Sequence, residues 1–188
     1  MNDKDIARMK VLEERKLTET IEDYLKKCVE LRNKIGRNPK GYNYVSQEDY
    51  VLDKGRQYFE RKLTKDEKKI IWKLKREACI DEGRCFENCL RIAIEDKSGL
   101  VRYVEGFACA VIPVHHAWLV INDAVVDVTW DLKHMKPLTP DREYYGVEFP
   151  DKKRLKLKLW DSQLSFLDDW PNKWPLLKEK RSSRSSTG

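Results

Sequence analysis

HHAWLVINDAVVDVTW, residues 115–130, carries the strongest structural signal in this sequence. Two apolar, β-branched runs flank a short polar joint, Asn122-Asp123, which is the pattern of a β-hairpin with a tight turn. In such a hairpin His116 on the first strand falls opposite Asp127 on the second, or within a residue or two of it. Residues directly opposite each other point to the same face of a sheet. The stretch therefore predicts a carboxylate beside an imidazole, which can fix the imidazole tautomer and stabilise its protonated form.

A third member of this site is predicted upstream, at Cys85. The sequence there leads into an apolar helical pattern that runs through Glu95, so Cys85 falls in the first turn of a helix. Unpaired N–H groups, the positive end of the helix dipole and the adjacent Arg84 all favour a thiolate at this position. His116 could hold that thiolate as an ion pair and later return a proton, while Asp127 orients the imidazole.

Apolar spacing and capping residues predict the other elements. A helix is expected over residues 4–35, or two helices with a break near Thr18–Thr20, and another begins at Ser46 with apolar positions as far as Leu63. Further helices are expected from a capping box at Thr64 to near Gly83 and over residues 161–170. Strands are expected over residues 101–111 and 155–160, and residues 131–150 are loop-like. Helices come first, and a nucleophile-bearing helix then feeds a small antiparallel sheet. This order predicts the α+β class.

Charge is distributed unevenly along the 188 residues. Residues 1–80 hold 21 Lys and Arg against 15 Asp and Glu, residues 81–176 hold 13 against 16, and residues 177–188 hold 4 against 1. We expect a helical appendage or cover over 1–80, a catalytic core over 81–176 and a disordered basic tail over 177–188. A basic helical face can contact nucleic acid or an acidic partner, whereas a solvated surface with both signs is the simpler interpretation.

The sequence contains no signal that would direct the chain into or across a membrane. No run of 18 or more apolar residues occurs, and the charged N-terminus has no apolar signal-peptide core. We therefore expect a cytoplasmic protein without membrane contact, in which the five cysteines are thiols rather than a disulfide framework.

The order Cys85, His116, Asp127 resembles the transglutaminase-like branch of the papain-like superfamily. In that branch a nucleophilic Cys begins a helix, a His lies in a His-Ala-Trp strand, and an Asp lies in a Val-Asp-Pro-Thr strand. Here the motifs are HAW at 116–118 and VDVT at 126–129, with Val128 in place of the Pro. The resemblance implies a papain-like fold and a Cys-His-Asp triad, but no particular substrate.

A closer resemblance is to a group of uncharacterised bacterial and phage proteins. Their motifs are Cys-Tyr/Phe-x-Asn-Ala, Tyr-Val-Glu-Gly, His-Ala-Trp, Val-Asp-x-Thr-Trp and Tyr-Phe/Tyr-Gly-Val. This chain has CFENC at 85–89, YVEG at 103–106 and YYGV at 144–147 in addition to the hairpin. Cys89 stands where that group has Ala, which favours Cys85 as the nucleophile. The resemblance covers about residues 83–150 and leaves out the N-terminal helices.

Together these features predict a cysteine hydrolase or acyltransferase that acts on a protein or peptide amide, by hydrolysis, deamidation or transamidation. No cofactor or metal is required. The residues expected to line a substrate cleft are Asn88, Glu105, Trp118, Tyr144 and Tyr145. For the tyrosines, packing against a tryptophan is the competing interpretation, and for Asn88 it is a contact with the backbone.

Other classes of function stay open. Taken alone, the Cys, the His and the Asp each have a structural interpretation. The chain would then be a non-catalytic binding protein whose basic N-terminal helices contact nucleic acid or an acidic protein. A zinc site from Cys85, Cys89, Cys109 and a neighbouring His is less favoured, because no Cys-x-x-Cys pair occurs. His115 points away from His116 in a regular strand and is excluded from the triad, and His134 is left unassigned.

Overall fold

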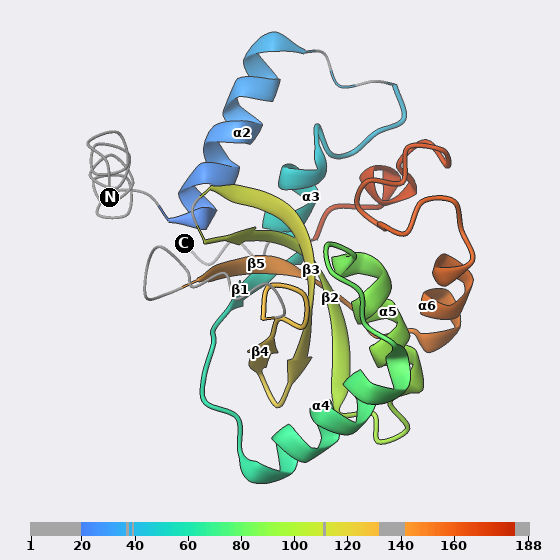
Figure 1. Ribbon diagram of the computed structural model, residues 1–188. Coiled ribbons are helices and arrows are strands. Elements are labelled where there is room, and N and C mark those ends of the chain that lie inside the picture. The colour runs from blue at the N-terminus through green and yellow to red at the C-terminus, as the bar shows by residue number, and fades with distance from the viewer. Residues whose placement is uncertain (1–19, 37, 39, 111, 132–141, 183–188) are drawn as a thin grey trace, which may run out of the picture.

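The computed structural model describes residues 20–36, 38, 40–110, 112–131 and 142–182. In chain order the elements are α2 (Ile21–Ile35), α3 (Gln47–Lys54), β1 (Arg56–Tyr58), α4 (Lys65–Ala78), α5 (Cys85–Glu95), β2 (Val101–Cys109), β3 (Pro113–Ile121), β4 (Ala124–Val126), β5 (Glu143–Phe149), α6 (Lys152–Leu159) and the 3₁₀ helix η1 (Pro175–Lys178). Helices surround one antiparallel sheet, so the fold is α+β (Figure 1). Residues 4–19 of the first predicted helix lie outside the described residues.

The sheet has the strand order β1-β5-β2-β3-β4, and every neighbouring pair is antiparallel. β2 and β3 pair along their full length, from Val101 opposite Ile121 to Cys109 opposite Pro113. The sheet curls until its two edges meet beyond β1. There Phe59 bridges to Ala124, and the N–H of Val125 donates to the Phe59 carbonyl (3.2 Å). The curl gives the sheet an inner face and an outer face.

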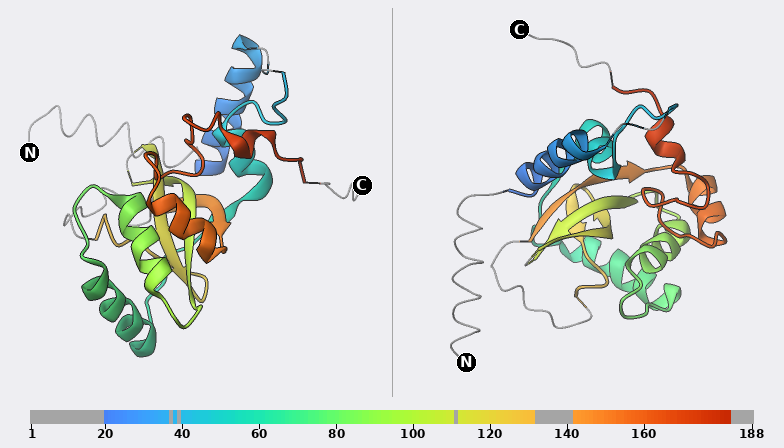
Figure 2. Two further views of the ribbon diagram at one scale, coloured as in Figure 1. Left: turned by 90° about the vertical axis from the view of Figure 1, so that its right-hand side faces the viewer. Right: turned by 90° about the horizontal axis from the view of Figure 1, so that it is seen from above.

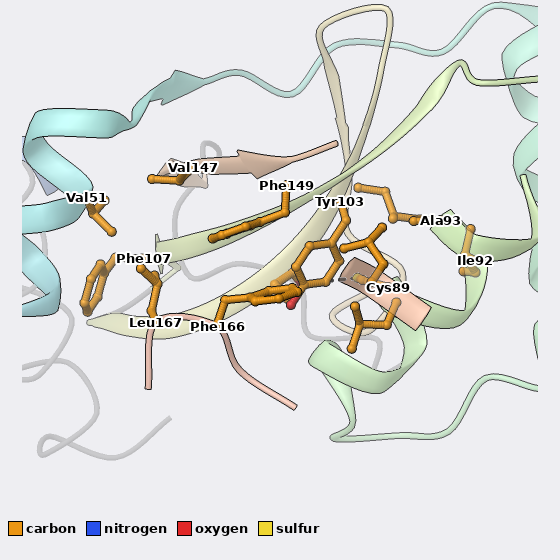
Figure 3. Close-up of a cluster of buried hydrophobic side chains, with 14 of the residues drawn as sticks. Val51, Cys89, Ile92, Ala93, Tyr103, Phe107, Val147, Phe149, Phe166 and Leu167 are labelled. Atoms are coloured by element: carbon orange, nitrogen blue, oxygen red, sulfur yellow. Dashed lines mark hydrogen bonds between the residues drawn. The ribbon is translucent and has the colours of Figure 1, made fainter. Parts of the chain in front are cut away.

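Each face of the sheet buries its own core. The outer core joins the sheet to the helices, with α2 and α3 toward one end and α4 and α5 toward the other (Figures 1 and 2). Figure 3 shows part of it, where Cys89 of α5 faces Tyr103 and where Phe149 stacks on Phe166 with ring centroids 4.5 Å apart. The inner core is smaller and rich in aromatic residues: Tyr58, Val104, Ala108, Trp118, Val120, Val125 and Tyr144, with Trp130 packed against it.

Two paired glycines allow the strong curl. Gly106 of β2 lies opposite Gly146 of β5. A Cβ on Gly106 would lie 2.2 Å from the carbonyl oxygen of Tyr145, and a Cβ on Gly146 would lie 2.6 Å from the ring of Trp118. Neither position has room for a side chain, so the two glycines let β2 and β5 approach closely behind the Trp118 ring.

The predicted hairpin is confirmed. Residues 119–121 of β3 pair with Ala124–Val126 of β4, and the turn residues Asn122 and Asp123 have φ values of 46° and 62°. Positive φ at both central positions is what a type I′ turn requires. Glu67 fixes the turn from outside, because it accepts hydrogen bonds from the Asn122 side chain (3.0 Å) and from Arg61 (2.7 and 2.9 Å).

Several predicted helix starts are also confirmed. Ser46 caps α3, Thr64 forms a capping box with Glu67, and α5 begins at Cys85. Thr20 caps α2 close to the predicted break. Hydroxyl side chains at these positions accept hydrogen bonds from first-turn N–H groups that have no partner within the helix. α4 ends earlier than predicted, at Ala78, and Cys79 closes it in the left-handed conformation (φ 49°).

The prediction of a strand over residues 155–160 is wrong, because this stretch belongs to α6. Alternating Leu and Lys suggested a strand with one wet face. Asp151, however, caps a helix by accepting the N–H groups of Lys153 (2.9 Å) and Arg154 (3.4 Å). The buried positions are Leu155 and Lys158, three residues apart as on one helix face, whereas Leu157 is 76% exposed.

Two further predictions were wrong in the second half of the chain. Residues 131–150 were expected to be loop-like, yet residues 143–149 form β5, which lies between β1 and β2. The prolines that suggested a loop do not fall within this strand. Residues 161–170 contain bends and turns rather than a helix. Backbone N–H groups of that segment bind the Glu105 carboxylate instead (Phe166, 2.9 Å; Leu167, 2.8 Å).

The expected boundary at residue 80 does not separate two packing units. Gly55 ends α3, and the stretch predicted as helix up to Leu63 contains β1, an edge strand of the sheet.

Residues 177–182 of the expected disordered tail are also ordered. Arg181 pairs with Asp49, and the N–H of Ser182 donates to Asp53 (2.8 Å). These contacts join the C-terminal end of the described chain to α3. None of the described helices has the length and apolar character needed to span a membrane.

Candidate active site

The free edge of β3 brings α5 to the hairpin. β4 pairs only with residues 119–121, so on that side the earlier part of β3 has no partner strand among the described residues. There the buried thiol of Cys89 donates a hydrogen bond to the carbonyl of Ala117 (3.4 Å). Cys85 lies one helical turn before Cys89. This attachment therefore places the first turn of α5, and with it Cys85, beside His116.

His116 and Asp127 form a buried pair. Nε2 of His116 lies 2.7 Å from Oδ2 of Asp127, and both side chains are almost completely excluded from solvent. The other carboxylate oxygen, Oδ1, accepts the N–H groups of Thr129 (3.2 Å) and Trp130 (2.9 Å). The turn that follows β4 therefore fixes the carboxylate, and the carboxylate fixes the imidazole.

Cys85 completes the group. Its half-buried side chain interacts with the His116 imidazole and helps to raise the pKa of that ring. Since Asp127 occupies Nε2, Nδ1 is the ring nitrogen that remains for Cys85. Burial disfavours the charged imidazole, but the hydrogen bonds and charges of Asp127 and Cys85 outweigh it and raise the pKa of His116 to about 9. At neutral pH this imidazole is a cation next to a cysteine sulfur.

Aromatic rings cover the pair. The Trp130 ring stacks on His116 with centroids 4.4 Å apart and an interplanar angle of 17°. Trp118 lies farther along, at 6.5 Å and 23°. The rings set the plane of the imidazole and keep water from the His116–Asp127 hydrogen bond, where a lower local dielectric strengthens charge interactions.

The Tyr144 hydroxyl also contacts the His116–Asp127 pair, at the Asp127 carboxylate. Its hydroxyl lies 3.2 Å from Oδ2 of Asp127 and 3.0 Å from Oε1 of Glu60. Burial, followed by the charges of Asp127 and Glu60, raises the pKa of Tyr144 far above its usual value, so the hydroxyl keeps its single proton and donates it to one carboxylate at a time. Sequence reasoning missed these roles of Trp130 and Tyr144. The available signal for Trp130 was its position three residues after Asp127.

The first turn of α5 begins at Cys85 without a side-chain cap from the described residues. Arg84, the N-cap residue, makes no side-chain capping hydrogen bond within the described chain, and the helix bonding starts with the N–H of Asn88 to the Arg84 carbonyl (2.9 Å). The Arg84 guanidinium was expected to favour the thiolate. It pairs with Glu87 instead (3.1 Å), so the helix start itself is the local source of positive potential.

Asn88 does not line a cleft but ties three segments together. Its side chain accepts the N–H of Asp81 (3.1 Å), donates to the Asp81 carbonyl (2.7 Å) and donates to the Thr129 hydroxyl (3.1 Å). It is 2% exposed. The amide therefore holds the loop before α5 and the turn after β4 in fixed positions relative to Cys85.

The other four cleft candidates are also buried. Trp118 and Tyr144 lie in the inner core, and Tyr145 lies on the outer face. Glu105 is fully buried on the outer side, where its carboxylate accepts hydrogen bonds from the side chains of Tyr103 (3.0 Å), His115 (3.0 Å) and Ser165 and from the N–H groups of Phe166 and Leu167. It anchors the segment after α6. His115 points away from His116, as predicted.

Within the described part of the chain, no group of three or more His, Cys, Asp or Glu side chains is arranged to hold a metal ion. His134 lies outside the described residues. No family model, curated protein or solved structure matches this chain. The class of the site therefore has to be argued from its own geometry: a half-buried cysteine at a helix start, a charged imidazole and a fixed carboxylate, in an α+β fold.

Proposed function

We propose that this protein is a cysteine-dependent acyl-transfer enzyme that acts on amides. The observation that carries the proposal is that Cys85 and Asp127 both act on the His116 imidazole, Asp127 through a 2.7 Å hydrogen bond, and together raise its pKa to about 9. A cationic imidazole beside the thiol favours the thiolate, which is the nucleophilic form of cysteine. Cys89 lacks this setting, because burial and nearby charges raise the pKa of its thiol well above the usual value.

In the proposed reaction the Cys85 sulfur forms a bond to the carbonyl carbon of the amide. The N–H of Cys85 at the start of α5 donates to the developing oxyanion. His116 then gives its Nδ1 proton to the amide nitrogen, the C–N bond breaks, and a thioester remains on Cys85. Water or an amine attacks the thioester while His116 removes a proton, and Cys85 leaves as the thiolate. Asp127 holds the imidazole in place through both steps.

The same reasoning extends to the type of core. A nucleophile at the start of a helix, packed against an antiparallel sheet that carries the His with the Asp just beyond it, supports a papain-like, transglutaminase-like core. Hydrolysis, deamidation and transamidation share the thioester and differ only in the leaving group and the acceptor. The proposal therefore covers all three.

The experiment that tests this function uses p-nitrophenyl acetate, an activated acyl donor that needs no specific recognition. We expect the full chain to release a burst of nitrophenol and to carry an acetyl group on Cys85, located by peptide mass spectrometry. Cys85→Ala should abolish the burst, and His116→Ala should slow it by about a hundredfold or more. Cys79→Ala is the matched control and should keep the burst, because Cys79 is exposed and lies outside the candidate site. An acetyl group spread equally over the accessible cysteines would refute the proposal.

A further inference from the structure

α4 presents an exposed basic face beside the candidate active site. Lys68, Trp72, Lys75 and Arg76 share this face, since they lie three, four, seven and eight residues apart along the helix. Trp72 is 63% exposed, and the Arg76 guanidinium lies over its ring at 4.8 Å. Figure 1 shows α4 at the outer edge of the molecule, below the β3–β4 hairpin. An exposed aromatic side chain among cationic side chains forms a surface that is suited to binding another molecule.

The face forms one wall of a shallow groove. Lys68, Trp72, Lys75 and Arg76 line it on the helix side, and Val126 and Asp131 line it on the hairpin side. An adjoining hollow shares Leu63, Val126 and Asp131 with this groove and extends to Asp127. Asp131 also follows Trp130, whose ring covers His116. A chain lying in the groove would thus pass close to Asp127 and to the turn that carries Trp130.

The charge of the groove is positive. Lys68 and Lys75 form no ion pair with another described residue, and the one carboxylate that lines the groove, Asp131, is bound by Arg142 (3.1 Å). The negative charge at the rim is therefore already compensated, while the cations on the helix are not. A bound segment with carboxylates facing α4 and an apolar side chain against Trp72 would match this surface.

We propose that this groove docks an acidic peptide segment of the protein substrate. The inference rests on the proposed function, because it assigns the groove to the substrate of that reaction. An acidic peptide fits better than nucleic acid, because the basic face spans little more than two helical turns. The adjoining hollow is lined by carboxylates as well as cations, with Glu60, Asp127 and Asp131 beside Arg61, Lys62 and Arg142. A long polyanion would meet these carboxylates beyond the basic face, whereas a short acidic stretch on α4 would not.

The test measures binding without chemistry. The full chain carrying Cys85→Ala is titrated against a short fluorescent peptide that is rich in Glu and carries one Leu, and binding is followed by fluorescence anisotropy. We expect binding that weakens with salt. Lys68→Glu combined with Lys75→Glu should weaken it by about tenfold or more, and Trp72→Ala should weaken it by several-fold.

Matched controls keep the assignment specific. Lys69→Glu changes the charge of the same helix outside the groove, and Trp160→Ala removes a tryptophan that is 89% exposed on another surface. Both should bind within about twofold of the parent. Equal binding by the charge-reversed variant would overturn the docking site, and so would tighter groove-dependent binding of oligothymidylate of the same charge.

The binding result is independent of the acyl-transfer result. If p-nitrophenyl acetate labels Cys85 but the peptide does not bind, the docking site is wrong and the proposed function stands. If the peptide binds in the groove but Cys85 is not labelled, the groove is a docking site of a binding protein and the proposed function is wrong.

Discussion

His116 is held by three different kinds of contact. Asp127 accepts a hydrogen bond from Nε2 (2.7 Å), Cys85 helps to raise the pKa of the ring, and Trp130 stacks on the ring face. Asp127 therefore fixes the orientation of the imidazole, Asp127 and Cys85 favour its charged form, and Trp130 fixes its plane. The cation is therefore part of the folded structure and not only of the proposed chemistry.

This predicts that stability depends on pH through His116. The folded pKa of about 9 lies above the ordinary value of 6.5, so the folded protein binds the proton more tightly than the unfolded chain does. The resulting stabilisation is fully present below pH 6.5 and is lost as the pH rises through about 9. We expect it to be on the order of 3 kcal/mol, from about 1.4 kcal/mol per unit of pKa shift.

Urea unfolding at both ends of this pH range measures the effect. The free energy of unfolding of the native chain should fall more between pH 6.5 and pH 9 than that of His116→Gln, which lacks the imidazole at this position. If both proteins show the same pH dependence, His116 is not a stabilised cation.

Cys85, His116 and Asp127 were recognisable from the sequence because hairpin register and a helix start both follow from local patterns. The structure brings these three together. For Asn88 the alternative interpretation, a contact with the backbone, is confirmed by its two hydrogen bonds to Asp81. The role of Glu105 was not recognisable, because its partners are distant in sequence and lie on the outer face of the sheet. Polar residue type indicated a cleft, whereas burial made both residues structural ties.

α5 owes its position to two ties: Cys89 to the Ala117 carbonyl, and Asn88 to Asp81 and Thr129. Asn88 is the stronger of these, because it satisfies three hydrogen bonds across two loops. It is also the point at which the loop before Cys85 and the turn after Asp127 are joined.

Asn88→Ala should therefore lower the free energy of unfolding by about 2–3 kcal/mol, since it leaves the backbone N–H and carbonyl of Asp81 and the buried Thr129 hydroxyl without this partner. Asn172→Ala, which removes a more exposed amide, is the matched control and should cost less than about 1 kcal/mol. Chemical denaturation measures both. A loss for Asn88→Ala no larger than that of the control would show that the amide does not hold α5 in place.

Prediction of the elements succeeded where local chemistry decides and failed where tertiary contacts do. The helix caps at Ser46 and Thr64 and the hairpin turn are local features. The conformations of α6 and β5 do not follow from their own sequences in this way. The Leu-Lys alternation of α6 describes a helix with little burial, and β5 takes its place from the neighbouring strands β1 and β2. Propensity is a weak guide in such segments.

The N-terminal half of the chain belongs to the same fold as the candidate site. β1 is an edge strand of the sheet, and the outer core includes Leu25, Val51 and Leu74 from α2, α3 and α4. Arg61 and Glu67 also hold the turn between β3 and β4. The sequence suggested an appendage because charge and helix content change near residue 80, but charge describes the surface and not the core.

A fragment of residues 81–176 should consequently fail to fold. It lacks β1 and the helices α2, α3 and α4, which supply part of the outer core, so a large apolar surface would be exposed to water. Circular dichroism and urea titration should show no cooperative unfolding, in contrast to the full chain. Cooperative unfolding of the fragment with the stability of the full chain would mean that residues 1–80 are an appendage after all.

The measurement that tests the account most directly is the alkylation rate of each cysteine by iodoacetamide as a function of pH, mapped by peptide mass spectrometry. Cys85 should react fast well below pH ~8.5, where an ordinary thiol is mostly protonated, and His116→Ala should remove this advantage. Exposed Cys79 serves as the ordinary thiol, and buried Cys89 should hardly react. If Cys85 follows the same pH curve as Cys79, the paired thiolate and imidazolium do not exist and the acyl-transfer proposal fails.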